Sequence, residues 1–275
     1  MKTPAAAVVV LVLAAALMPG QRRALADTAG DCDGASGTQI MQRAHDRERG
    51  DRAVQLWRMT LTNPDGVTRE RTVKTLYMYF AGNLQRRIIR FLAPADIRRT
   101  TFLNIEVADR VDDQYIFLPA YERTKRIANT ERARSFMGTD YTYEDILTRD
   151  VAADEHTCIG GEPIGEWRTY HVRSVPRPGS DSQYRAMDHW VDSASDVIVQ
   201  TRFYGADQDP VKQLSVHRID RFEQVLVVTD STMTNLRENH GTRIEVTGVR
   251  FDHPEVLEGL FTVQRIDTRE LPGIE

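Results

Sequence analysis

The feature that most constrains the fold is a period of two in the apolar residues over most of the chain. Residues 55–62 place Trp57, Met59 and Leu61 on one face of a strand. Turn sequences such as NPDG at 63–66 separate segments of this kind. The pattern predicts a mainly β chain with few helices, built from roughly ten antiparallel strands as a sandwich or as an open or closed barrel. The predicted strands are residues 55–62, 68–80, 84–92, 113–118, 122–128, 166–175, 184–192, 196–204, 211–220, 224–234 and 242–251.

Residues 1–26 have the composition of an export signal. Lys2 precedes an unbroken apolar run over residues 5–18, and Ala24 and Ala26 occupy the small-residue positions of a cleavage site. The run is shorter than the about 20 residues that a membrane-spanning helix needs. We therefore predict a Sec signal peptide that is cleaved before Asp27, which leaves a soluble, exported protein that does not span the membrane.

The next segment, residues 27–50, is predicted to form a leader and one helix. Ser36 or Thr38 can cap a short helix that ends before Gly50. An exported protein meets an oxidising compartment, where cysteines can pair. Cys32 and Cys158 either form a disulfide that joins the leader to the body or remain two thiols, because sequence does not supply the geometry.

One later segment breaks the period of two. Residues 134–151 are predicted to form a loop that runs into a short helix, capped by Thr139 or Thr142. Gly160 and Gly161 are expected to form a hairpin turn before the next strand. The chain contains no internal repeat and no linker long enough to divide two domains. Residues 51–275 are therefore predicted to form a single domain that includes the 134–151 loop and helix.

Charge and motifs argue against several functions. The formal net charge is −4, whereas a nucleic-acid-binding protein needs a basic face. The sequence contains neither G-x-S-x-G nor H-E-x-x-H, and it has no phosphate-binding glycine loop. Two cysteines and seven scattered histidines do not define a set of metal ligands. We expect a protein that is not an enzyme and that uses no metal, no cofactor and no nucleic acid.

Large apolar side chains on the predicted strands and on the 134–151 loop suggest a binding function. A strongly curved sheet encloses space, as in small ligand-binding barrels. The alternative is an ordinary core that these side chains fill by themselves. The predicted lining of an apolar pocket is Trp57, Met59, Tyr77, Tyr79, Phe91, Phe102, Phe117, Phe136, Met137, Tyr141 and Trp190.

Six segments in the second quarter and near the end of the chain resemble the outer-membrane lipoprotein-sorting proteins. The most specific are LPA at 118–120 and SFMGTDY at 135–141. The resemblance is to the LolA-like branch that is often found beside RND-type (MMPL) exporters and is related to the LolA and LolB carriers. It covers most of the mature chain. The six segments are residues 91–97, 101–103, 112–120, 124–127, 135–145 and 258–263.

The resemblance implies a half-open β-barrel, formed by a curved antiparallel sheet and closed by short helices. Its apolar cavity would take lipids or the acyl chains of lipoproteins in the periplasm of a diderm bacterium, with no catalysis and no cofactor. An RND/MMPL-type transporter of the inner membrane is the implied partner. The 134–151 segment is then expected to act as a lid whose Phe136, Met137 and Tyr141 face the cavity, or else as a buried plug that does not move.

Two arginines depart from the family pattern, which usually has a glycine before Thr100. Arg98 and Arg99 place two long cations beside the expected mouth of the cavity. They are expected to contact an anionic headgroup, or else solvent.

Other functions remain compatible with the sequence. One is a periplasmic adaptor of an exporter, with a cavity filled by its own side chains. A periplasmic hydrolase is less favoured, because no nucleophile and base form a recognisable set. Barrels that span the outer membrane share the alternation, but this chain carries charges on both strand faces, as at 69–71 and 86–87. We expect the protein to be a monomer.

Overall fold

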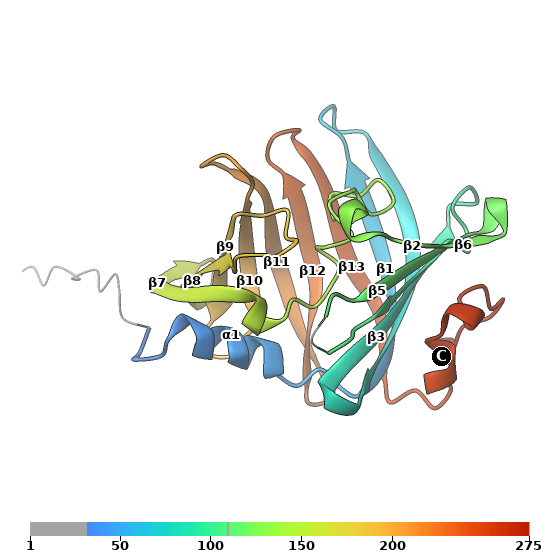
Figure 1. Ribbon diagram of the computed structural model, residues 1–275, viewed down its shortest axis with the longest axis horizontal. Helices are drawn as coiled ribbons and strands as arrows, with labels where there is room; N and C mark the ends of the chain where they lie inside the picture. The colour runs from blue at the N-terminus through green and yellow to red at the C-terminus, as the bar shows by residue number, and fades with distance from the viewer. Residues whose placement is uncertain (1–31, 109, 275) are drawn as a thin grey trace, which may run out of the picture.

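The protein folds into one curved antiparallel sheet of 13 strands, seen in a computed structural model that describes residues 32–108 and 110–274 (Figure 1). The predicted signal peptide lies outside these described residues. The strands are β1 (Arg52–Thr62), β2 (Thr68–Phe80), β3 (Leu84–Ala93), β4 (Thr101–Ile105), β5 (Asp113–Leu118), β6 (Arg123–Arg126), β7 (Asp154–Ile164), β8 (Trp167–Pro176), β9 (Ala186–Asp192), β10 (Ile198–Tyr204), β11 (Pro210–Phe222), β12 (Val225–Asn235) and β13 (His240–Phe251).

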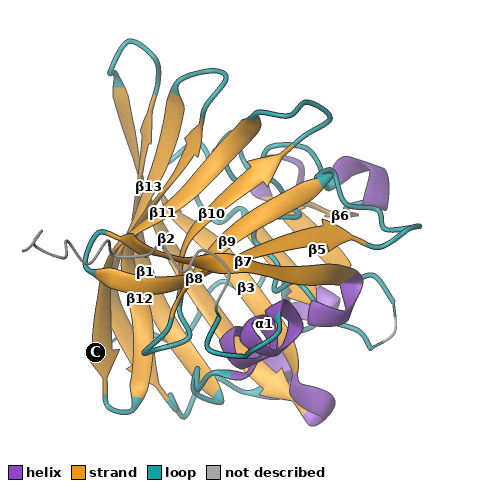
Figure 2. Ribbon diagram, turned by 90° about the vertical axis from the view of Figure 1, so that its left-hand side faces the viewer, coloured by secondary structure: helices purple, strands orange, loops and turns teal. Residues whose placement is uncertain are grey.

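The order of the strands explains why a long connection crosses the molecule. β1 to β6 run in sequence from the middle of the sheet to one edge, and β7 to β13 run from the opposite edge back to β1. The sheet curves strongly but does not close (Figure 2), so β6 and β7 remain its two edges. Residues 127–153 therefore pass from one edge to the other over the concave face. The predicted fold class, a mainly β half-open barrel, is confirmed.

The convex face of one half of the sheet is covered by the end of the chain. Phe261 and Val256, which lie beyond β13, pack with Val54, Leu76 and Ile88 of the first three strands. This segment contains two short 3₁₀ helices, Glu258–Leu260 and Val263–Arg265. Strands β1 to β3 are therefore buried on both faces, which explains why apolar residues occur at both parities along residues 84–92.

The α-helix α1 (Gly37–Asp46) begins as the sequence predicts. Ser36 caps it, accepting from the Gln39 backbone N–H at 3.2 Å, while the Gln39 side chain accepts from the Ser36 N–H at 2.9 Å. This reciprocal pair satisfies two N–H groups that would otherwise have no partner in the first turn. Ile40 and Ala44 are buried against β8 and β9, so the helix packs on the concave side near the β7 edge.

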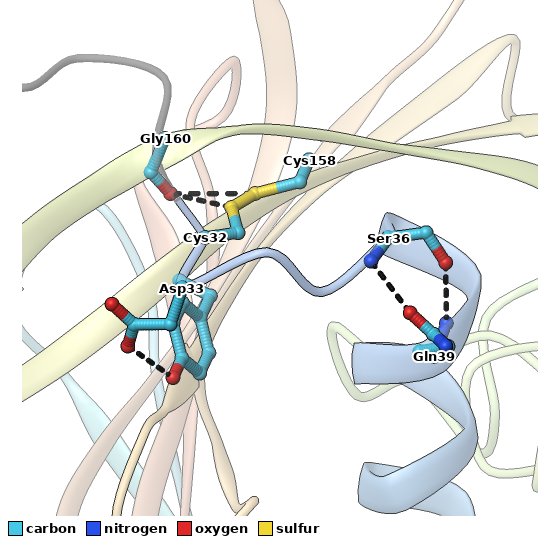
Figure 3. The surroundings of a disulfide bond; sticks show 7 residues. Cys32, Asp33, Ser36, Gln39, Cys158 and Gly160 are labelled. Carbon is cyan, nitrogen blue, oxygen red and sulfur yellow. Dashed lines mark hydrogen bonds between the residues drawn. A yellow bond between two sulfur atoms is a disulfide. The ribbon is translucent and has the colours of Figure 1, made fainter.

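A disulfide joins the start of the described chain to β7. It links Cys32 to Cys158, and the backbone oxygen of Gly160 lies beside both sulfurs (Figure 3). At Gly37 a Cβ atom would lie 2.7 Å from the backbone carbon of His156, so the close approach of helix and strand requires glycine there. Within the described residues, no helix is long and apolar enough to cross a membrane.

Three local expectations need correction. Gly160 and Gly161 do not form a hairpin turn; they lie inside β7, where the pairing with β8 shifts between Cys158 and Gly160. Strands β4 and β7 were not expected at all. The segment 134–147 contains no helix; it is a loop with one isolated β-bridge, between Ser135 and Thr142, and a 3₁₀ turn follows at Val151–Ala153.

Candidate functional site on the concave face

An aromatic cluster fills the middle of the concave face. Phe136, from the connection between β6 and β7, is only 1% exposed. The centroid of its ring lies 5.9 Å from that of Phe91 on β3 and 5.4 Å from that of Phe102 on β4. Tyr143 of the same connection meets Phe136 edge-on at 5.5 Å. The connection thus covers an apolar surface that the strands alone would leave in contact with water.

The loop that carries these aromatic side chains, residues 134–147, also receives hydrogen bonds from side chains of the strands. Arg71 of β2 donates to the backbone oxygen of Met137 at 2.6 Å. Gln114 of β5 donates to the backbone oxygen of Tyr143 at 2.9 Å. We call residues 134–147 the lid loop from here on.

A buried ion pair fixes the C-terminal part of the lid loop. The Asp145 carboxylate accepts from the ammonium of Lys212 on β11, and both side chains are less than a tenth exposed. The Tyr184 hydroxyl donates to the same carboxylate at 2.7 Å. Burial, followed by the charge of Asp145, raises the pKa of Tyr184 above its ordinary value, so the phenol stays protonated and acts as a donor.

Two further carboxylates hold the lid loop. Asp140 accepts from the Thr242 hydroxyl at 2.6 Å and lies 2.9 Å from the ring nitrogen Nδ1 of His240. Glu144 accepts from the backbone N–H of Gln183 at 3.1 Å and from Arg149 at 3.1 Å. The lid loop therefore joins an apolar inner surface to a ring of charge-assisted hydrogen bonds, which are stronger than neutral ones.

The concave face of β2 to β5 changes from apolar to polar along the strands. Residues directly opposite one another in antiparallel strands point to the same face. One paired row under the lid loop is almost wholly apolar, and the row two residues further along is polar. The apolar row is Thr75, Ile89, Phe102 and Ile116, and the polar row is Tyr77, Arg87, Asn104 and Gln114.

Two surface hollows in the described part of the chain lie outside the aromatic cluster. One, of about 450 Å³, lies beside the Cys32–Cys158 disulfide. The other, of about 300 Å³, lies around His240 and Arg243. The described residues also contain no group of three or more His, Cys, Asp or Glu side chains placed to hold a metal ion. In this conformation the apolar surface is filled by the lid loop.

Nine of the eleven residues predicted to line a pocket lie on this face, in two sets. The phenol rings of Tyr77 and Tyr79 lie 6.0 Å apart toward the polar end of β2. The other set belongs to the aromatic cluster, which buries Met59, Phe91, Phe102, Phe136 and Tyr141 and has Trp57 and Met137 packed against it.

Two of the predicted pocket residues face the other way. Phe117 alternates with Ile116 and packs in the convex cluster under the C-terminal segment. Trp190 alternates with His189 and stacks on His171 with ring centroids 4.4 Å apart. The sequence did not distinguish the faces, because residues 113–118 carry large apolar side chains at both parities.

The predicted headgroup arginines do not meet on the concave face. Arg99 donates from Nη2 to the backbone oxygen of Asp267 at 3.2 Å, and Asp267 belongs to the C-terminal segment on the convex side. The neighbouring Arg98 is exposed on the connection between β3 and β4.

Several residues of the cluster were missed. Most of these residues lie in strands that the sequence predicts. The pattern of a single strand, however, does not show which of its residues will contact the lid loop. Lys212 is an example, since its partner Asp145 lies on the lid loop. The aromatic residues and methionines of the cluster that were missed are Tyr143, Tyr184, Met187, Phe203 and Met233.

A half-open antiparallel sheet whose concave face is covered by the connection between its two edges is a LolA-like fold. A family model with the description "uncharacterized protein" matches residues 83–268. The chain belongs to that family. A comparison with curated proteins finds no match.

Three solved structures have the same fold. A DUF1329 family protein from Desulfovibrio piger is 23% identical, with a TM-score of 0.79 over 84% of this chain and 97% of its own. A putative outer membrane lipoprotein-sorting protein domain from Vibrio parahaemolyticus is 22% identical, with a TM-score of 0.79 over 84% and 98%. A LolA superfamily protein from Nitrosomonas europaea is 14% identical, with a TM-score of 0.66 over 84% and 99%.

Proposed function

We propose that this protein carries lipids or lipoprotein acyl chains on the apolar half of its concave face, without catalysis and without a cofactor. The observation that supports the proposal is the position of the groups that cover this surface. Phe136 and Tyr143 belong to a connection and not to a strand, so they can leave while the sheet stays paired. Withdrawal of the lid loop would open a surface lined by Phe91 and Phe102.

The free energies are compatible with an acyl chain taking the place of the lid aromatics on the apolar surface. An acyl chain of ~15 methylenes costs about 12 kcal/mol to expose to water, at about 0.8 kcal/mol for each methylene. Exposing a buried phenylalanine such as Phe136 costs about 2 kcal/mol. A bound acyl chain can therefore offset the exposure of the lid aromatics and the loss of some of the polar contacts of the lid loop.

We further propose that the protein works as a monomer in the periplasm of a diderm bacterium and exchanges its cargo with an RND/MMPL-type transporter of the inner membrane. The export signal supports the compartment, and the oxidised Cys32–Cys158 pair is consistent with it. The transporter follows from the resemblance to the LolA-like branch alone.

A second candidate is an adaptor of an exporter that carries no lipid. The filled aromatic cluster favours it, because Phe136 already occupies the apolar surface at 1% exposure. The two candidates differ in one observable property, the presence of bound lipid.

The variant Phe136→Ala tests the carrier against the adaptor. Removal of the ring should weaken the closed lid loop by about 3–5 kcal/mol, the usual cost of a phenylalanine-to-alanine change in a core. We expect the mature variant to take up several times more lipid from phosphatidylcholine vesicles than the parent protein, measured by native mass spectrometry after the vesicles are removed.

Phe261→Ala is the matched control, because Phe261 is also fully buried but lies on the convex face. It should lower stability by a similar amount without changing uptake. Equal uptake by both folded variants would contradict a movable lid, and a lack of lipid on all three proteins would favour the adaptor.

A further inference from the structure

Three arginines gather at the polar end of the concave face, away from the lid loop. Arg87 of β3 lies over the ring of Tyr77 at 5.9 Å. The Tyr77 hydroxyl donates to the backbone oxygen of Arg49, and Arg49 donates to the Tyr79 hydroxyl at 3.4 Å. Arg47, two residues before Arg49, donates to a backbone oxygen of β12 at 2.9 Å. Guanidinium groups and phenols thus converge where α1 leads into β1.

Within the described part of the chain, none of these three arginines forms an ion pair with a carboxylate. The ion pairs that arginines form with Asp or Glu among the described residues all belong to arginines outside this cluster. Arg87 uses Nε to donate to Gln85 at 3.0 Å. The nearby acid is Glu106, and its Oε1 is buried without a hydrogen-bond partner.

The cluster is costly as it stands. Burial, with a further contribution from the like charge of Arg49, lowers the pKa of Arg47 to about 10. Burial also lowers the pKa of Arg87; Tyr79, Tyr77 and Glu106 act in the opposite direction, and Arg49 adds to the lowering. Burial thus deprives both protonated side chains of solvation, and a carboxylate, Glu106, acts on the pKa of Arg87 alone. A bound anion would supply the missing counter-charge.

We propose that Arg47, Arg49 and Arg87, with Tyr77 and Tyr79, bind the anionic group of an amphiphile, a phosphate or a carboxylate. The inference rests on the carrier function proposed above and specifies its cargo as an anionic lipid. The spacing fits, because Val73 of the aromatic cluster and Tyr77 lie four residues apart on β2, about 13 Å at the rise of a strand. The acyl chain lies under the lid loop, and the headgroup reaches the arginines.

Arg87→Gln tests the site, and Arg86→Gln is its matched control. The two positions are adjacent on β3 and each variant removes one positive charge. Arg86, however, faces the convex side, over the ring of Phe80 at 4.2 Å and near the backbone oxygen of Phe261. Arg49→Gln is a second test variant in case Arg87→Gln unfolds, and melting curves check that each protein is folded.

The probe is a phosphatidylcholine vesicle containing equal amounts of phosphatidylglycerol and diacylglycerol with the same acyl chains. Native mass spectrometry then gives the ratio of the two minor lipids bound to the protein. We expect the parent protein and Arg86→Gln to prefer phosphatidylglycerol about tenfold, the effect of a charge-assisted hydrogen bond. Arg87→Gln and Arg49→Gln should bring the ratio close to one while diacylglycerol is still bound.

The outcomes separate this inference from the carrier proposal. Lipid bound without a preference, or an equal loss of preference in Arg86→Gln, overturns the anion site and leaves the carrier intact. If no protein binds lipid, the carrier proposal fails, and inorganic phosphate becomes the deciding probe. A rise in melting temperature with phosphate that is lost in Arg87→Gln would support a site for a free anion, and no rise would overturn it.

Discussion

Single residues decide which half of the concave face is apolar. On β3 the alternate positions Phe91 and Ile89 belong to the aromatic cluster, whereas Arg87 and Gln85 continue the same face with polar groups. The period of two in the sequence predicted that these residues share a face. It could not show that the change from apolar to polar repeats on the neighbouring strands, because that depends on the register between them.

One buried histidine makes stability depend on pH. His189 lies on the concave side of β9, with its Nδ1 3.0 Å from the Thr201 hydroxyl. Burial, with the charge of His156 as a smaller cause, lowers the pKa of His189 to about 4 from its ordinary value of about 6.5. Since the unfolded chain then binds the proton more readily than the folded one, the contribution of His189 to stability is lost as the pH falls from about 6.5 toward 4.

We expect the free energy of unfolding to fall by about 2 kcal/mol between pH 7 and pH 5 through this group. Urea denaturation at the two pH values measures it. His189→Gln, which keeps a polar contact to Thr201 but cannot be protonated, should remove this part of the change. The same pH dependence in the variant would show that another group is responsible.

Among the elements, the lid loop differs most from the sequence-based prediction, which expected a short helix there. Thr142 and Asp145 exchange hydrogen bonds in the way a helix cap does, at 2.7 and 3.3 Å, but no helix follows. The carboxylates of Asp145 and Glu144 instead bind Lys212 and Gln183, which are remote in the chain. By contrast, α1 was predictable because its cap at Ser36 is followed by apolar residues at helical spacing, Ile40 and Ala44, which the structure buries.

Asp145→Asn should loosen the lid loop without disturbing the sheet. Removing one partner of a buried ion pair costs about 3–5 kcal/mol, because the other charge remains buried. Hydrogen exchange measured by mass spectrometry should therefore become about a hundredfold to a few thousandfold faster within residues 134–147. Glu155→Gln is the control, because the Arg177–Glu155 pair is 54% and 65% exposed and contributes little. Unchanged exchange in Asp145→Asn would show that the aromatic cluster alone holds the lid loop.

At the scale of the whole molecule, the path of the chain produces the candidate site. The sequence predicted most strands and the curved sheet, but local patterns do not encode which strands form the edges. Because β6 and β7 lie on opposite edges, residues 127–153 have to pass from one edge to the other, and they do so over the concave face. The same path leaves one end of that face apolar under Phe136 and the other end basic around Arg87.

Native mass spectrometry is the most direct test of whether the protein carries a lipid. The mature protein is purified from periplasm without detergent, and any bound lipid is then extracted and identified. We expect one lipid for each protein chain, bound on the concave face and carrying an anionic group. A protein mass without lipid, together with no uptake from added vesicles, would contradict the carrier and leave Phe136 as the permanent occupant of the apolar surface.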